Sequence, residues 1–327
     1  MASKYSIEKI DNNERWQEFA IKSQEYTIFV NPVYLDSLDI SYQTFFVKKG
    51  IEIKASFVLT VSNDEKNIIH DEFAIYSGIL FNNDSSQKRV KKTSEKFEIS
   101  ELVIDYLEKN YNSISLQLSP MYKDMRPFLW FNYHSSDESK KFKLNLRYTS
   151  YCDISEINNN DEEETLFFKN LDTIRQRNIR KARKEQSTTN EELNVELFLK
   201  FYSELMLKQG ELVSEKKLSK ISKIINSLVL SGDAVMLTTR NSNQEIIYLM
   251  VFAVDKNRAY YLFGAGNLDA PEKYKGTICF WDSFKILSSK YNIKIVDMEG
   301  INSPKRGWFK LSFGGTIVPY YKVSLGE

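Results

Sequence analysis

The sequence predicts an α/β (α+β) protein of two tandem domains, each with a mixed, mostly antiparallel sheet flanked by helices. Its 327 residues exceed what one ordinary hydrophobic core organises. The second half alternates helical and strand patterns in an order that recurs, less distinctly, in the first half. In each of the segments 106–116 and 286–296, a predicted helix ends at Lys, Tyr and Asn residues and a predicted strand follows directly. We therefore place the domains at residues 1–154 and 155–327, with the last strand able to pack back toward the first domain.

The elements of the second half follow from periodicity and from capping residues. The acids of Asp161–Glu164 open a predicted helix that continues to Ala182. Further elements are expected in chain order: helices at 194–208 and 216–230, strands at 234–240, 246–254 and 259–264, a helix at 276–290, and strands at 293–298 and 316–323. The helix at 276–290 has one apolar face. A strand meander followed by a helix and a strand predicts a parallel neighbour reached by a right-handed crossover.

The first half gives the same order with weaker signals. Asn31 and Pro32 supply a cap and a first helical residue. The elements expected here are helices at 13–22 and from 31, strands at 43–48, 51–61 and 73–81, a helix at 98–109, and a strand at 113–118. The polar segment 155–164 reads as the linker between the domains.

Composition excludes several classes of function. A net charge of +1 argues against a surface that coats nucleic acid. The two cysteines, Cys152 and Cys279, and the two histidines, His70 and His134, give no disulfide framework, metal set or nucleophilic triad. No signal peptide or membrane-spanning run is visible, so we expect a cytoplasmic protein without a transmembrane segment.

Two segments could bind anions. Arg175, Arg177, Arg180 and nearby cations form a basic helix end, which is either a solvated helix terminus or a phosphate site. Lys275, Gly276 and Thr277 begin a helix, where backbone amides could hold a donor phosphate. The alternative for this second segment is a plain loop with Thr277 as the cap.

The chain's most informative segment follows the strand at 293–298. Asp297 and Glu299 alternate with apolar residues, so both are expected on one face, where they could position or deprotonate an amine. A solvated or lysine-paired role is the alternative. Lys310 lies between Phe309 and Phe313 in a predicted turn, and periodicity alone makes it a surface lysine.

Neighbouring tyrosines lie on the strand at 259–264. Tyr260 and Tyr261 point to opposite faces, and core positions for both are favoured by the pattern. One of the two could instead line a cleft at the end of the strand.

These residues together resemble the Fem-type group, the peptidoglycan bridge aminoacyltransferases and related polysaccharide-associated N-acyltransferases with the GNAT fold. The resemblance rests on segments of the second half and, more weakly, of the first: Arg177–Lys184, Tyr260–Tyr261, Tyr274–Gly276, Asp297–Gly300, Phe309–Gly314, Asn31–Tyr34, Tyr76–Phe81 and Leu118–Pro120. It implies an active-site role for Lys310, a substrate contact for Phe309, and a substrate-lining role for Tyr261 and, less directly, Tyr260. The fuller Gln/Arg-x-x-Gly-x-Gly/Ala signature of acyl-CoA transferases is absent.

The resemblance implies a bacterial cell-wall or polysaccharide enzyme that moves an acyl group to the amine of an amino sugar or glycan precursor. No bound cofactor or metal is expected, because acyl-CoA or aminoacyl-tRNA would be a co-substrate. Aminoacyl-tRNA-dependent transfer to a peptidoglycan-type precursor is the alternative, although the inserted coiled-coil arm of the bridge-forming enzymes is missing. A non-catalytic module that binds nucleic acid or another anion through the basic helix is a further alternative. Transfer close to a membrane surface is also compatible with the sequence.

Overall fold

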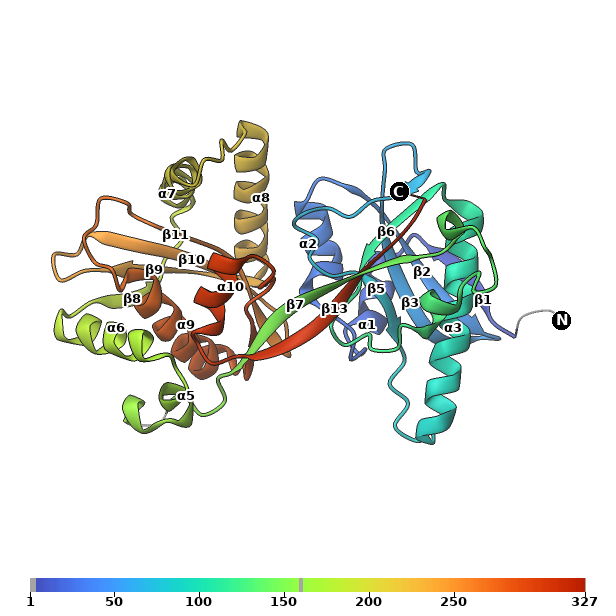
Figure 1. Cartoon of the computed structure of the whole chain (residues 1–327), viewed down its shortest axis with the longest axis horizontal. Coiled ribbons are helices and arrows are strands. Elements are labelled where there is room, and N and C mark those ends of the chain that lie inside the picture. The colour runs from blue at the N-terminus through green and yellow to red at the C-terminus, as the bar shows by residue number, and fades with distance from the viewer. Residues whose placement is uncertain (1–3, 159–160, 327) are drawn as a thin grey trace. The chain divides into compact units, whose positions relative to one another are not determined.

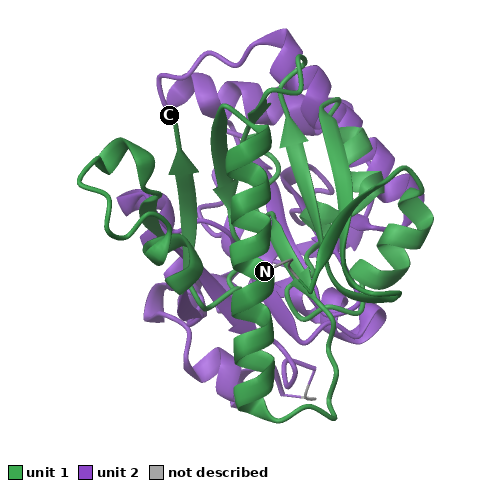
Figure 2. Cartoon of the chain, turned by 90° about the vertical axis from the view of Figure 1, so that its right-hand side faces the viewer, with its two compact units in different colours: residues 1–147, 319–327 green, residues 148–318 purple. Residues whose placement is uncertain are grey.

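A computed structural model describes residues 4–158 and 161–326. Residues 159–160, within the expected linker, lie outside the described residues, as do residues 1–3 and 327. The chain divides into two compact units, residues 1–147 with 319–327 and residues 148–318 (Figure 2). The expected boundary after residue 154 thus lies inside the second unit, and the last nine residues belong to the first unit.

Unit 1 contains a sheet with helices on both faces (Figure 1). Its elements are β1 Ser6–Ile10, α1 Asn13–Ala20, α2 Pro32–Ser37, β2 Ser41–Lys49, β3 Glu52–Val61, β4 Asn67–Ile68, β5 Gly78–Phe81, α3 Arg89–Asn110, β6 Ser113–Gln117, α4 Arg126–Trp130, and the first part of β7 Lys143–Asp153. Asn31 caps α2 through its side chain and Pro32 begins the helix, as the sequence predicted. β2 pairs antiparallel with β1 and β3, and β5 pairs antiparallel with β3.

Unit 2 is also layered, with α7 and α8 on one face of its strands and α6 and α9 on the other (Figure 1). Its elements are α5 Leu166–Lys169, α6 Thr173–Lys184, β8 Thr188–Glu191, α7 Val195–Lys208, α8 Glu215–Ser231, β9 Ala234–Arg240, β10 Ile246–Val254, β11 Arg258–Gly266, α9 Lys275–Tyr291, β12 Ile295–Asp297, α10 Pro304–Leu311, and β13 Thr316–Leu325, whose end lies in unit 1. The expected apolar face of α9 is fully buried in the core.

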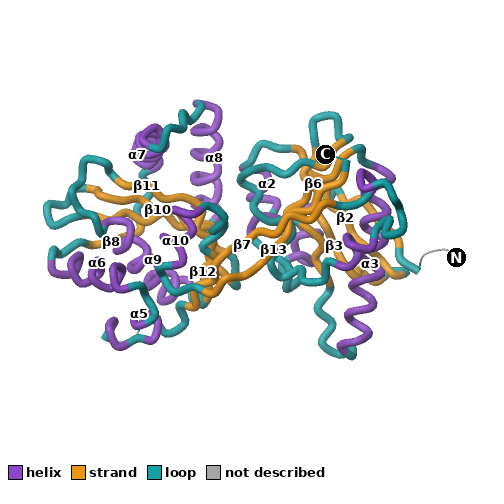
Figure 3. The backbone as a smooth tube through the Cα atoms, viewed as in Figure 1, coloured by secondary structure: helices purple, strands orange, loops and turns teal. Residues whose placement is uncertain are grey.

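The two units repeat one order of elements, which the tube in Figure 3 lets the reader follow. In unit 2, three antiparallel strands lead through α9 to β12, which pairs parallel with β11 and antiparallel with β7. In unit 1, β2, β3 and β5 lead through α3 to β6, which pairs antiparallel with the end of β13. The parallel neighbour expected after the meander is therefore present in unit 2.

Several boundaries differ from expectation. The helix predicted from Asp161 to Ala182 is broken, because the Asp172 side chain accepts a hydrogen bond from the Ile174 N–H and starts a new helix, α6. The predicted turn around Lys310 is the helix α10. The strands β1 and β8 carry too many exposed polar residues to give a strand pattern. The strand β7 was also not predicted, although residues 143–148 alternate between polar and apolar side chains.

None of the helices in the described ranges combines the length and the apolar character needed to cross a membrane.

A network of hydrogen bonds and ion pairs joins the short turn Glu162–Glu164 to two helices of unit 2. Glu162 accepts hydrogen bonds from Arg183 of α6 at 2.9 Å and from the indole N–H of Trp281 of α9 at 2.8 Å. Lys285 lies 3.2 Å from the same carboxylate. Although burial alone raises the pKa of Glu162, the hydrogen bonds and cations outweigh it and lower the pKa to about 2.

This network predicts that Glu162→Gln lowers the free energy of unfolding by roughly 2 kcal/mol at pH 7. Because the pKa is lower in the folded protein than its ordinary value of 4.5, the stabilisation is complete above pH 4.5 and declines as the pH falls toward 2. Urea denaturation of the wild type and the variant at pH 7 and pH 3 measures this. Glu164→Gln, in the same short turn and paired with exposed Lys169, is the control. A wild-type advantage that stays constant from pH 7 to pH 3 would contradict the assignment.

Candidate active site

The site is built where two neighbouring strands of unit 2 separate. β11 and β12 pair in parallel only over Arg258–Tyr260 and Ile295–Asp297. Beyond Asp297 the chain follows β7 instead, because the Met298 N–H donates to the Ser150 carbonyl at 2.9 Å and the Ile301 N–H to the Tyr148 carbonyl at 3.0 Å. Within the described chain, residues 261–266 of β11 therefore have a strand neighbour only on the β10 side.

A β-bulge lies on this open part of β11. Val251 of β10 faces Phe263, and the next residue, Phe252, faces Tyr261, so Leu262 is the extra residue. Bulges bend and re-aim a strand and are frequent beside active sites. The bulge was not visible in the sequence.

The two predicted carboxylates lie at the point of separation, and both are buried. Asp297 accepts hydrogen bonds from the Thr149 hydroxyl of β7 and from the Glu299 N–H, the latter at 2.8 Å. Glu299 has a φ of +53°, a left-handed conformation that costs energy for a residue with a β-carbon. The two residues therefore do not simply alternate along a strand, since β12 ends at Asp297 and Glu299 is turned by its backbone.

Glu299 has an unused hydrogen-bonding atom. Its Oε1 is buried and has no hydrogen-bond partner among residues 4–158 and 161–326. Buried polar atoms are nearly always paired in folded proteins. An unpaired carboxylate oxygen at the end of a strand, on a strained backbone, favours a role in binding or proton transfer.

Lys310 joins these carboxylates, contrary to the surface position that periodicity alone predicted. Its Nζ donates to the carbonyl oxygens of Glu299 at 3.3 Å and Gly300 at 3.2 Å. It also lies 5.2 Å from the centre of the Tyr261 ring. The helix α10 carries it there by packing closely at Gly307, where a β-carbon would lie 2.6 Å from the Ile301 carbonyl oxygen.

The electrostatics of the three groups are linked. Burial and the charge of Asp297 raise the pKa of Glu299 well above its ordinary value, and Lys310 acts in the opposite direction. Burial lowers the pKa of Lys310, whereas Glu299 and Asp297 raise it. A carboxylate with a raised pKa is a stronger base, and a lysine with a lowered pKa exchanges its proton more readily.

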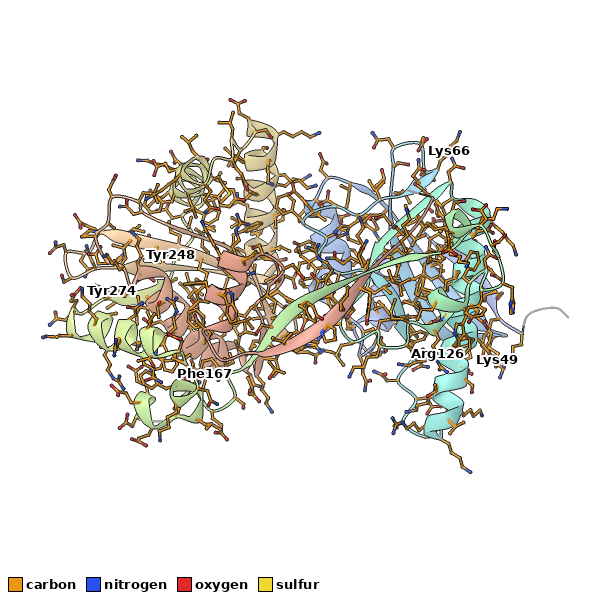
Figure 4. All side chains as sticks on the ribbon, viewed as in Figure 1. Lys49, Lys66, Arg126, Phe167, Tyr248 and Tyr274 are labelled. Atoms are coloured by element: carbon orange, nitrogen blue, oxygen red, sulfur yellow. The ribbon has the colours of Figure 1, made fainter. Side chains whose placement is uncertain are left out.

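Tyr261 lies beside Lys310, whereas Tyr260 is buried and pairs in register with Asp297. The hydroxyl groups of Tyr261 and of Tyr248, which is labelled in Figure 4, form a hydrogen bond. Gly264 packs closely against them, since a β-carbon there would lie 2.5 Å from the Tyr261 hydroxyl oxygen. Tyr260 is fully buried and donates to Asp255 at 2.8 Å, so it belongs to the core and contacts the turn that precedes β11.

Phe309 contacts Arg175, one of the cations of the basic helix end. The Arg175 guanidinium lies 4.5 Å from the centre of the Phe309 ring. It donates to the hydroxyl groups of Ser312 at 2.8 Å and Thr277 at 2.7 Å, and Asn178 also donates to Thr277, at 3.2 Å. Arg175 therefore connects α10 to the first turn of α9.

The predicted phosphate-binding residues lie in that first turn. Thr277 is inside α9 and does not cap it, because the N-cap is Tyr274. Lys275 donates to the carbonyl oxygens of Asn267 and, at 2.7 Å, Ala270. Gly276 packs against the Tyr248 ring. Within the described ranges, neither Lys275 nor Arg175 forms an ion pair with a carboxylate, although Asp172 acts electrostatically on Arg175 and Glu272 and Asp269 act on Lys275.

The exposed arginines of α6 lie apart from this cluster of contacts. Arg180 pairs with Glu163 at 2.7 Å and lies over the Phe168 ring. Arg177 is exposed. Their contacts fit the solvated-helix interpretation, whereas Arg175 of the same basic helix end lies beside Phe309.

Two contributors were therefore missed: Thr149 and the bulge at Leu262. Thr149 is 148 positions away from Asp297 in the sequence, and no local pattern marks such a contact. Arg175 was included in the basic run, but nothing distinguished it from its exposed neighbours.

Comparison with solved structures places this arrangement among known folds. The chain is similar to FemX, with a TM-score of 0.65, 12% identity and 96% of each chain covered. It is also similar to the tandem GNAT protein from the clavulanic acid biosynthesis pathway, with a TM-score of 0.53, 10% identity and 98% of each chain covered. A third similar structure is the C-terminal domain of a putative lysylphosphatidylglycerol synthetase from Agrobacterium fabrum. Its TM-score is 0.54 and its identity 11%, and the match covers 96% of this chain and 92% of that one.

The sequence itself matches no protein-family model and no curated protein. At 10–12% identity, the structural similarity establishes the fold. The chain has the Fem-type, tandem GNAT-like fold, which confirms the fold expected from the sequence.

Proposed function

We propose that this chain, with the tandem GNAT-like fold that it shares with FemX, is an N-acyltransferase whose active site lies in unit 2. The acceptor would be the amine of an amino sugar or of a glycan or cell-wall precursor, and the donor would be acyl-CoA. The observation that carries the proposal is the buried, unpaired Oε1 of Glu299 beside Lys310. This pair supplies a base and a cation at the open edge of a strand.

In the proposed reaction, the acceptor nitrogen attacks the carbonyl carbon of the donor thioester. Glu299, in its carboxylate form, takes the proton from the nitrogen. Lys310 and N–H groups on the open edge of residues 261–266 stabilise the negative charge that forms on the carbonyl oxygen. The carbon–sulfur bond then breaks, and Glu299 gives the proton that it took from the nitrogen to the sulfur, so coenzyme A leaves as the thiol.

Asp297 has a supporting role in this scheme. It is fully buried and holds the Glu299 backbone through the 2.8 Å hydrogen bond. Its charge also raises the pKa of Glu299. We infer that Asp297 positions and tunes Glu299, and that Glu299 is the group that receives the proton.

The donor would enter at the joint between β11 and α9. Lys275 and Arg175 offer cations without carboxylate partners in the described chain, at the first turn of a long helix. The description of the tandem GNAT neighbour names acetyl-CoA as the ligand missing from that structure, which supports a coenzyme A thioester. Aminoacyl-tRNA is the competing donor, because the resemblance to the Fem-type group implies it and the chain shares the fold of FemX.

A donor-competition assay tests the proposal. The purified protein is given either labelled acetyl-CoA or labelled aminoacyl-tRNA, together with glucosamine, UDP-glucosamine and a peptidoglycan precursor as acceptors. We expect label to move from acetyl-CoA to an amine. Transfer of label from tRNA alone would show that aminoacyl-tRNA, and not acetyl-CoA, is the donor. Transfer from neither donor, together with salt-sensitive nucleic-acid binding, would favour a non-catalytic module.

A further inference from the structure

A cavity of about 180 Å³ lies in unit 1, outside the site described above. It is bordered by the end of β5, by the loop 82–88 and by the first turns of α3. This joint between β5 and α3 is the counterpart, in the repeated order of elements, of the joint between β11 and α9 in unit 2. The repeat therefore places a cavity in unit 1 where unit 2 has its candidate donor site.

Charges of both signs line the cavity. The cations are Lys54 of β3 and Lys92 and Lys96 of α3, and the carboxylates are Asp84 and Glu95. These groups act on one another, because Lys54 and Lys92 both help to lower the pKa of Asp84, after the larger effect of its hydrogen bond from Ser86. Lys54 also lies 3.8 Å from Glu95.

Two of the charged side chains at this place are almost completely removed from solvent. Lys54 is 8% exposed and Glu25 is 4% exposed. Glu25 forms an ion pair with Lys96 at 2.7 Å. Lys96 also lies 4.7 Å from the centre of the Phe81 ring. Buried ion pairs contribute little net stability compared with apolar residues, so their presence around an open cavity favours a binding role.

The polar groups around the cavity retain hydrogen-bonding capacity. The amide nitrogens of Asn82 and Asn83 donate to the carbonyl oxygens of Ile53 and Lys22. Their amide oxygens have no donor among residues 4–158 and 161–326. Each lysine ammonium has three N–H donors, and Lys96 uses one of them on Glu25.

We propose that this unit 1 cavity binds a small zwitterion, namely a free α-amino acid. Its carboxylate would lie against Lys92 and Lys96, and its ammonium group against Asp84 and Glu95. A purely anionic ligand would meet the two carboxylates, and a purely cationic one would meet the three lysines, so neither matches the lining. The volume suits a molecule of this size and is too small for a nucleotide cofactor. The proposal does not depend on the function proposed for unit 2.

Calorimetric titration of the full-length protein with each of the twenty free L-amino acids tests this proposal. We expect at least one to bind with a dissociation constant below about 1 mM. We also expect its N-acetyl derivative, which lacks the positive charge, and its amide, which lacks the negative charge, to bind at least tenfold more weakly. Binding of none of the twenty would overturn the proposal. Equal binding of the N-acetyl form would also overturn it and indicate a plain anion site.

Substitutions locate the binding. Lys92→Ala and Asp84→Asn change partly exposed side chains of the lining, so both variants should fold, as their melting temperatures would show. Each should weaken binding at least tenfold. Lys91→Ala, at an exposed neighbour on the same helix that does not line the cavity, should bind like the wild type. Unchanged affinity in both lining variants would contradict the assigned position.

Discussion

Replacing Lys310 with alanine is expected to lower the rate of acyl transfer by about 10²–10³-fold, the usual effect of removing one donor that stabilises an oxyanion. The ammonium group lies next to Glu299 and over the Tyr261 ring, and no other lysine contacts Glu299 in the described chain. Single-turnover transfer of label from the donor to the amine measures the change.

Two further variants make this result specific. Lys310→Met keeps the length of the side chain, so it separates loss of the charge from loss of packing in α10. It should be as slow as Lys310→Ala. Lys305→Ala removes an exposed lysine of the same helix and should leave the rate unchanged. Turnover by Lys310→Met at the wild-type rate would show that the charge of Lys310 has no role in the reaction.

Replacing Glu299 with glutamine is expected to lower kcat/KM by about 10²–10⁴-fold, the range for a general base. In the wild type the rate should rise with pH, because the carboxylate form of Glu299 is the active one. The rise should extend above the range of an ordinary glutamate, since burial and Asp297 raise the pKa of Glu299.

The pH profile of the variant distinguishes a base from a structural residue. Glu299→Gln should lose this rising limb, whereas a variant that is merely misfolded would lower the rate at every pH without changing the shape of the curve. Glu211→Gln, at an exposed position between α7 and α8, is the control. An identical pH profile in the wild type and Glu299→Gln would show that another group accepts the proton.

Periodicity and capping were sufficient to predict the fold because the elements that form the layers carry strong local signals. The apolar face of α9 repeats at helical spacing and is buried as expected. Gly232 ends α8 in a left-handed conformation, as a glycine after a helix should. The strand β7 was missed although residues 143–148 alternate between polar and apolar side chains, and its pairing partner β12 comes from far along the chain.

The candidate site was only partly predictable, for a related reason. Asp297, Glu299 and Lys310 lie in one short segment, so the sequence could mark them as a group. Their burial could not be foreseen, since it depends on packing against Thr149 of β7 and on the left-handed turn at Glu299. The sequence likewise could not distinguish Arg175 from Arg177, because the contact of Arg175 with Ser312 depends on how α6 packs against the end of α10.

The central claim is that unit 2 holds the donor beside Lys310 and the open edge of β11. A crystal structure of the protein with an acetyl-CoA analogue whose thioester sulfur is replaced by a methylene group tests this claim most directly. We expect the carbonyl oxygen of the analogue within hydrogen-bond distance of Lys310 Nζ or of an N–H group of residues 261–266, with Glu299 Oε1 facing the reactive carbon. An analogue whose carbonyl lies away from both Lys310 and the β11 edge would contradict the account.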